Sequence, residues 1–307
     1  MSTVTVGMDA ELNPAQRLHA LGQSLWLDSI NRVMLRTGTL ARYVRDLAVT
    51  GLTSNPTILG HAMAAGSDYD LSLARLSGEG VTEAQDLVYA LALEDLTEAA
   101  ALFRPEWERT GGVDGYVSLE VPPDVAYDAA ATVAFARRLH GQAGFPNLLV
   151  KIPGTPQGLT AMEEAITAGI GVNVTLLFSD THYLRTADAY LRALERRRRA
   201  GLDLPDTYYL GRLAAPDTID TVPEKTLLAF ADHGSPDDRL EPDYAAAERA
   251  IAAAADAGID ADALAEHLQR HGAGAFTGDW AALLTAIKEK AAKLTQHARG
   301  KIDEGSS

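Results

Sequence analysis

A short apolar segment that carries a lysine constrains this chain more than any other feature. Residues 147–153 read NLLVKIP, and Pro153 and Gly154 close the run. Branched apolar residues in a run cut off by a turn signal predict a strand that is buried on both faces of a parallel sheet. The segment therefore places Lys151 at the end of a buried strand.

Lys151 has two interpretations. An ammonium group at the end of a buried strand is costly to desolvate, so it should either pair or lose its proton. An uncharged lysine amine is the nucleophile that Schiff-base chemistry on a carbonyl requires. The alternative is a structural lysine whose stem lies along the sheet while its ammonium group reaches water. The segment alone leaves both interpretations open.

Strand-like runs alternate with helical patterns along most of the chain. This alternation predicts parallel strands in an α/β fold. A single TIM-type (β/α)8 barrel commonly reaches the length of this chain, 307 residues. From Glu224 onward the sequence is alanine-rich and helical, which predicts extra C-terminal helices that close over a barrel end or its outside; the expected helices are Asp243–Ala257, Asp260–His271 and Gly278–His297. With no repeat or linker, residues 1–307 are expected to form a single domain. The expected strands are Ser24–Asp28, Val49–Thr53, Tyr116–Val121, Leu148–Ile152, Val172–Leu177 and Tyr208–Leu210.

The composition argues against several classes of function. The formal net charge of −15 disfavours nucleic acid and anionic membranes as partners. The chain has no cysteine, and its eight histidines show no metal-ligand spacing beyond the pair His267 and His271, which lacks a third ligand. No stretch is long and apolar enough to span a bilayer, and no signal peptide pattern is present. We therefore expect a cytoplasmic protein without a metal.

Polar residues lie at or near the predicted strand ends, where such folds place their chemistry. They are Asp28, Asn55, Glu120, Asn173 and Thr175. Asn173 and Thr175 alternate along one strand, so both point to one side, and on the inner side both would approach Lys151. A lysine with two carboxylates, an amide and a hydroxyl makes an acid/base set for carbon–carbon bond chemistry through an imine. Singly, Asp28 or Asn55 can cap a helix, and Thr175 can be a β-former.

Six segments carry a family resemblance: SLWLD at 24–28, GLTSNPTI at 51–58, VSLEV at 117–121, LVKIPGT at 149–155, NVTLLFS at 173–179 and AAPDTIDTVPEKTL at 214–227. They resemble the longer, actinobacterial type of transaldolase, a class I Schiff-base family with an (α/β)8 fold. The last segment resembles the part that follows the family's final strand. The resemblance implies transfer of a dihydroxyacetone unit from sedoheptulose 7-phosphate to glyceraldehyde 3-phosphate, giving erythrose 4-phosphate and fructose 6-phosphate. It places this reaction in the pentose phosphate pathway, without a metal or organic cofactor.

The resemblance also implies roles for the polar residues. Lys151 would hold the dihydroxyacetone unit as an imine, and Asp28 would take the proton of the substrate hydroxyl as the carbon–carbon bond breaks. Glu120, together with Thr175, would place the water that moves protons while the carbinolamine forms and collapses. Asn55 and Asn173 would hydrogen-bond the bound three-carbon fragment.

The chain departs from the family between Gly201 and Tyr208. Relatives of this type carry a sixth strand, its helix and a seventh strand there, and this part resembles the one that holds a pocket serine and the arginines for the sugar phosphate. Arg212 is the nearest remaining arginine after the last expected strand, and a surface position suits it better. The imine machinery is thus retained in the sequence, whereas the phosphate clamp is not.

The missing segment should leave two sheet edges with unpaired backbone groups. We expect an open, partial barrel with six strands, because strand number, tilt and shear are tied together in a closed one. The alternatives are a smaller, strained barrel, two chains that associate through their open edges, and a deletion product that folds poorly. The expected function is a transaldolase acting on sugar phosphates with reduced activity. The alternatives are an inactive barrel remnant and an enzyme for small unphosphorylated ketones.

Overall fold

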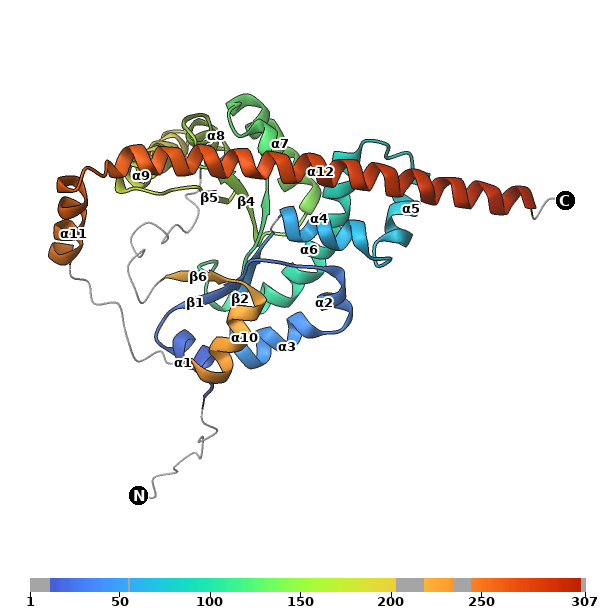
Figure 1. Ribbon diagram of the computed structural model, residues 1–307, viewed down its shortest axis with the longest axis horizontal. Coiled ribbons are helices and arrows are strands. Elements are labelled where there is room, and N and C mark those ends of the chain that lie inside the picture. Colours follow the sequence, from blue (N-terminus) through green and yellow to red (C-terminus); the bar gives the residue numbers. More distant parts are fainter. Residues whose placement is uncertain (1–11, 55, 203–217, 235–243, 305–307) are drawn as a thin grey trace, which may run out of the picture.

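Six parallel strands form one open sheet in the computed structural model, which describes residues 12–54, 56–202, 218–234 and 244–304. The strand order is β5-β4-β3-β2-β1-β6, so β5 and β6 are the two edges (Figure 1). The sheet is a half-barrel, which confirms the expected incomplete barrel of six strands. The strands are β1 (Ser24–Leu27), β2 (Val49–Thr53), β3 (Val117–Glu120), β4 (Leu148–Pro153), β5 (Val172–Thr175) and β6 (Ile219–Val222).

Helices connect successive strands and cover the outer face of the sheet. The apolar core lies between them and includes Leu27, Leu52, Val117, Val150 and Phe103, all of which are almost fully buried. The helices are α1 (Pro14–Ala20), α2 (Arg32–Arg36), α3 (Thr39–Leu47), α4 (Pro56–Ala65), α5 (Asp70–Gly78), α6 (Ala84–Arg109), α7 (Ala129–Ala143), α8 (Pro156–Thr167), α9 (Asp180–Arg199), α10 (Glu224–His233), α11 (Tyr244–Asp256) and α12 (Ala261–Glu304), with a 3-10 turn η1 at Pro123–Val125.

The last strand differs from the sequence prediction. The expected strand Tyr208–Leu210 lies outside the described residues, as does Arg212. The strand that pairs with β1 is instead Ile219–Val222, inside the segment assigned to the region after the final strand. Its sequence, IDTV, contains no run of apolar residues that would have marked it as a strand, and three of its four residues are exposed in the structure. Its pairing is parallel and joins Ser24 to Ile219.

α12 crosses the carboxyl ends of the strands and continues past the body of the molecule (Figure 1). It packs against α4, α5, α6 and η1. Gln269 of α12 donates from Nε2 to the carbonyl oxygens of Gly154 and Leu176, which follow β4 and β5, both at 2.9 Å. The sequence predicted separate helices at Asp260–His271 and Gly278–His297, whereas the structure has one continuous helix through Gly272, Gly274 and Gly278. The expected closure over a barrel end is confirmed.

A tryptophan fills the inner side of the half-barrel below the strand ends. Trp26 is opposite Gly51 in the β1–β2 ladder, and its indole Nε1 donates to Asp114 Oδ1 at 2.9 Å. A Cβ atom at Gly51 would lie 2.5 Å from the Trp26 indole, closer than any van der Waals contact allows. Only glycine fits at this position, because the ring is itself 2% exposed and fixed by Asp114.

Gly51→Ala should therefore lower the free energy of unfolding by about 1–3 kcal/mol through overpacking. The measurement is urea denaturation followed by circular dichroism. Gly141→Ala is the matched control, because Gly141 lies in α7 with nothing within 4 Å of the added methyl group, and helix propensity favours alanine there. Equal stability of the two variants would show that the indole can move away from Gly51.

Candidate active site

Three neighbouring strands bring polar side chains into one row on the inner face of the sheet. Glu120 of β3 is opposite Lys151 of β4, and Lys151 is opposite Asn173 of β5. In a parallel sheet, residues in register point to the same face, so the three side chains lie side by side. Lys151 Nζ lies 3.1 Å from Glu120 Oε2. The predicted lysine therefore pairs with one of the predicted carboxylates.

This ion pair is largely removed from water. The side chain of Lys151 is 14% exposed and that of Glu120 is 6% exposed. Burial raises the pKa of Glu120, while the charge of Lys151 acts in the opposite direction without cancelling the effect. Lys151 Nζ also donates to the carbonyl oxygen of Ser54 at 3.4 Å. A buried carboxylate that binds a proton more readily than usual can take one from a neighbouring amine or water.

Asn173 and Thr175 extend the site along β5. Asn173 Nδ2 donates to Ser118 Oγ at 3.2 Å, which orients the amide across β4 toward β3. Thr175 is opposite Pro153, and its Oγ1 atom is buried without a hydrogen-bond partner among the residues that the structure describes. An unpaired buried hydroxyl is costly, so it is available to a ligand or a water molecule. The sequence prediction that both residues lie on the side of Lys151 agrees with this register.

Asp28 follows β1, on the other side of β2 and β3 from Lys151. Its backbone N–H donates to the carbonyl oxygen of Val222 at 3.2 Å, which continues the β1–β6 ladder. Its Oδ1 atom is buried and has no hydrogen-bond partner in the described part of the chain. A carboxylate oxygen placed in this way can accept a hydrogen bond from a bound ligand. Asn55, the remaining predicted residue, lies outside the described residues.

The site has supports that sequence reasoning did not identify. Tyr89 of α6 donates its hydroxyl to the carbonyl oxygen of Glu120 at 2.8 Å. The ring of Trp280 in α12 lies 5.6 Å from that of Tyr89, so the long helix packs against the residue that holds β3. Ser118 precedes Glu120 by two residues, and strand alternation could have placed it on the inner face. No pattern in the sequence could have indicated Trp280, because its contact comes from a helix at the far end of the chain.

A groove lined by arginines lies outside the half-barrel, between α8, α9 and α12. Two of its arginines are already compensated, since Arg192 pairs with Asp188 and Arg270 pairs with Glu266. Arg185 is the only groove arginine with no acidic partner in the part of the chain that the structure describes. The groove therefore does not replace a phosphate clamp in which several free donors converge.

The described residues contain no cluster of three histidine or acidic side chains that could hold a metal ion. His267 and His271 stack on α12 with ring centroids 6.2 Å apart. Among the residues with described positions, no helix is sufficiently long and apolar to cross a membrane.

Comparison with known proteins gives a consistent result. The family model for transaldolase/fructose-6-phosphate aldolase matches residues 25–202 and 198–287. The chain is 34% identical to a transaldolase of Thiobacillus denitrificans over 359 positions, covering 90% of this chain and 100% of that protein. It is 33% identical to a transaldolase of Frankia alni (91% and 97% covered) and 33% identical to transaldolase 1 of Streptomyces coelicolor (94% and 97% covered).

The lengths and bounds of these matches agree with a segment of the relatives that is missing inside this chain. An alignment of 359 positions is longer than the 307 residues of this chain, so part of the relative faces no residue here. The family model matches in two parts that overlap at residues 198–202, at the C-terminal end of α9, the helix that follows the edge strand β5. The strand row that carries Lys151 and Glu120 lies within the first part. On the coverage of both parts and the identity to these relatives, the chain belongs to the transaldolase/fructose-6-phosphate aldolase family.

Proposed function

We propose that this protein is a transaldolase that moves a dihydroxyacetone unit between ketose and aldose phosphates through a Schiff base on Lys151. The observation that carries the proposal is the buried ion pair of Lys151 with Glu120, 3.1 Å apart on the inner face of the sheet. A lysine held next to a carboxylate with a raised pKa can pass its proton on and attack a carbonyl as a neutral amine. The transaldolase relatives and the family match support this reaction class.

The proposed reaction begins at the ketose carbonyl. Lys151 Nζ adds to the carbonyl carbon to give a carbinolamine. Glu120, with Thr175, places the water molecule that carries protons while the carbinolamine forms and then loses its hydroxyl group as water. The product is an iminium ion on Lys151. Asp28 then takes the proton of the hydroxyl on the far carbon of the carbon–carbon bond that breaks; this C–OH becomes the aldehyde of the departing aldose, and the bonding electrons leave an enamine on the lysine. The acceptor aldose reverses these steps, and Asp28 returns the proton.

The amides complete the proposed site. Asn173 lies next to Lys151 in the ladder, and its Nδ2 donor is held by Ser118, so the amide is in reach of a three-carbon fragment on the lysine. Asn55 is proposed for the same task. The substrates are sugar phosphates, and we propose a cytoplasmic location. We also propose that residues 1–307 act as one domain, since α12 packs against α4, α5 and α6 across the strand ends.

Borohydride reduction with fructose 6-phosphate should leave a covalent adduct on Lys151, located by peptide mass spectrometry. Hydride reduces the iminium bond to a stable amine, so the adduct marks the nucleophile. Lys151→Met should abolish the adduct. Lys290→Met is the matched control and should keep the adduct on Lys151. The side chain of Lys290 is similarly buried, at 16% exposed, and it pairs with Asp70 at 2.7 Å outside the strand row. An unlabelled Lys151, or an adduct that persists in Lys151→Met, would overturn the proposal.

Glu120→Gln should slow imine formation about a hundredfold, in the range typical for loss of a general acid/base. In the native protein the carboxylate is the proton acceptor, so the rate should fall as the pH drops through the pKa of Glu120. Because burial raises this pKa, the acidic limb should lie above the usual carboxyl range. The limb should vanish in Glu120→Gln and return in Glu120→Asp, as measured by single-turnover rates across pH. An unchanged acidic limb in Glu120→Gln would assign it to another group.

We further propose that two chains associate through the open sheet edges. β5 and β6 are the two edge strands of one parallel sheet. β6 of one copy can therefore pair in parallel with β5 of another copy and extend the sheet across both chains. Leu184 and Leu191 of α9, the helix that follows β5, are 63% and 55% exposed. In a sheet continued by a second chain these side chains would be covered, which supports a second copy as the partner.

Thr221→Pro should shift the protein from dimer to monomer in sedimentation velocity runs. The backbone N–H groups of Ser24 and Asp28 donate to the carbonyl oxygens of Thr218 and Val222, so the even-numbered residues of this segment face β1. Backbone groups alternate in direction along a strand, so those of Thr221 face away from β1. Proline there removes an outward N–H and spares the β1–β6 ladder. Thr221→Val is the control, since it keeps the backbone donor and should remain dimeric. A monomeric native protein would contradict this proposal.

A further inference from the structure

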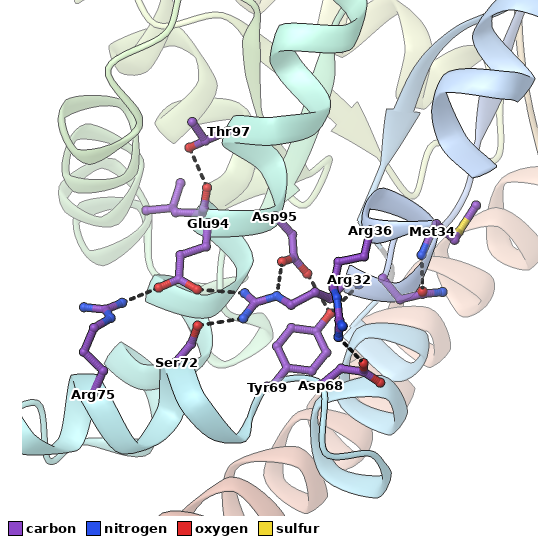
Figure 2. Close-up of polar contacts among 12 residues, drawn as sticks. Arg32, Met34, Arg36, Asp68, Tyr69, Ser72, Arg75, Glu94, Asp95 and Thr97 are labelled. Atoms are coloured by element: carbon purple, nitrogen blue, oxygen red, sulfur yellow. Dashed lines mark hydrogen bonds and ion pairs between the residues drawn. The ribbon is translucent and has the colours of Figure 1, made fainter. Parts of the chain in front are cut away.

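The loop that carries Asp28 ends at Arg32, which belongs to a partly buried polar cluster with Tyr69, Ser72, Glu94 and Asp95 (Figure 2). The guanidinium of Arg32 donates from Nε to Asp95 Oδ1 at 2.8 Å, from Nη1 to Ser72 Oγ at 2.7 Å and from Nη2 to Glu94 Oε2 at 2.8 Å. Its side chain is 13% exposed. Each of the three guanidinium nitrogens of Arg32 therefore has a hydrogen-bond acceptor, and the three acceptors come from α5 and α6.

Tyr69 links this cluster to the backbone. Its hydroxyl accepts from the backbone N–H of Arg32 at 3.0 Å and donates to Asp95 Oδ2 at 2.6 Å. Its ring lies under the guanidinium, with Cζ 4.4 Å from the ring centroid. Asp95 is 2% exposed and receives both bonds, so its charge is satisfied only while Arg32 and Tyr69 keep these positions. The hydroxyl thus fixes the backbone at Arg32, and not only its side chain.

Asp28 lacks such anchors of its own. Within the described residues no side chain bonds its carboxylate, and its Oδ1 atom is buried without a partner. Its direction is therefore set by the backbone on either side. On one side lies β1, which pairs with β2 and β6 and ends in the ladder bond from Asp28 N–H to the carbonyl oxygen of Val222. On the other lie three residues, of which Ser29 and Ile30 are buried and Asn31 caps α2 by accepting from Met34 N–H.

We propose that Arg32, Tyr69 and Asp95 form a positioning cluster that aims the carboxylate of Asp28 at the substrate hydroxyl. The inference rests on the proposed function, since it gives Asp28 its task in the cleavage step. The cluster is connected to the loop through a backbone hydrogen bond four residues after Asp28. On the strand side, β1 is held by β2 and by the exposed edge strand β6, and the cluster supplies the anchor on the helix side of the loop. An error of about 1 Å in the placement of a catalytic group can cost a hundredfold in rate.

The test separates the two chemical steps. Imine formation depends on Lys151 and Glu120, whereas bond cleavage depends on Asp28. Tyr69→Phe removes one oxygen and keeps the ring under the guanidinium. It should leave the rate of borohydride-trappable imine formation within about twofold of the native protein and lower the rate of aldose release about tenfold or more. A purely structural role would lower both rates together, or neither.

Two further variants complete the design. Arg75→Gln is the matched control, because Arg75 binds the other carboxylate oxygen of Glu94 at an exposed position and does not contact Arg32; both rates should be unchanged. Ser72→Ala removes one of the three hydrogen-bond acceptors of the Arg32 guanidinium. It should also lower the rate of aldose release, by a smaller factor than Tyr69→Phe does. It becomes the decisive variant should Tyr69→Phe lose its native circular dichroism spectrum.

The possible results are distinct. Absence of an imine on Lys151 in the native protein would overturn the proposed function, and the role of Asp28 with it. A native imine together with equal losses in both steps for Tyr69→Phe, or unchanged aldose release in Tyr69→Phe and Ser72→Ala, would overturn the positioning role alone. Selective loss of aldose release in these variants, with Arg75→Gln unaffected, would support it.

Discussion

The buried ion pair between Lys151 and Glu120 is the interaction on which the rest of the site depends. Two charges are stable in this place only because they lie 3.1 Å apart, since removing either partner would leave an isolated buried charge. Their distance is set by the parallel register of β3 and β4, which pairs the two residues directly. The backbone ladder therefore does the positioning, and Tyr89 reinforces it by bonding the carbonyl oxygen of Glu120.

The same sheet that fixes this pair is open at both edges. The central strands β2, β3 and β4 have neighbours on both sides, and they carry the Lys151 and Glu120 pair. Asn173 lies on the edge strand β5, and Asp28 follows β1, whose outer neighbour is the edge strand β6. α12 counteracts this openness, because Gln269 bonds the ends of β4 and β5 together. The cluster of Arg32 has a similar effect on the loop after β1.

Much of the site was predictable because strand alternation and burial leave clear signals. The apolar runs around β1 to β5 gave strands close to those observed, and polar residues at their ends were the candidates. What could not be predicted was β6, whose four residues are mostly exposed and form a strand only by backbone pairing to β1. The continuity of α12 was missed as well, because its glycines predicted a break that packing against α4 overrides.

The sequence alone determined the class of fold, the buried strand of Lys151 and the shortage of strands for a closed barrel. These follow from local patterns of apolar and polar residues, which act over a few neighbours in the chain. Only the tertiary structure decided that Glu120 is the partner of Lys151 and that Arg32 binds α5 and α6. It also decided that one carboxylate oxygen of Asp28 is buried with no partner among the described residues. These contacts join residues far apart in sequence, and their geometry is fixed by register and helix packing, which local patterns do not encode.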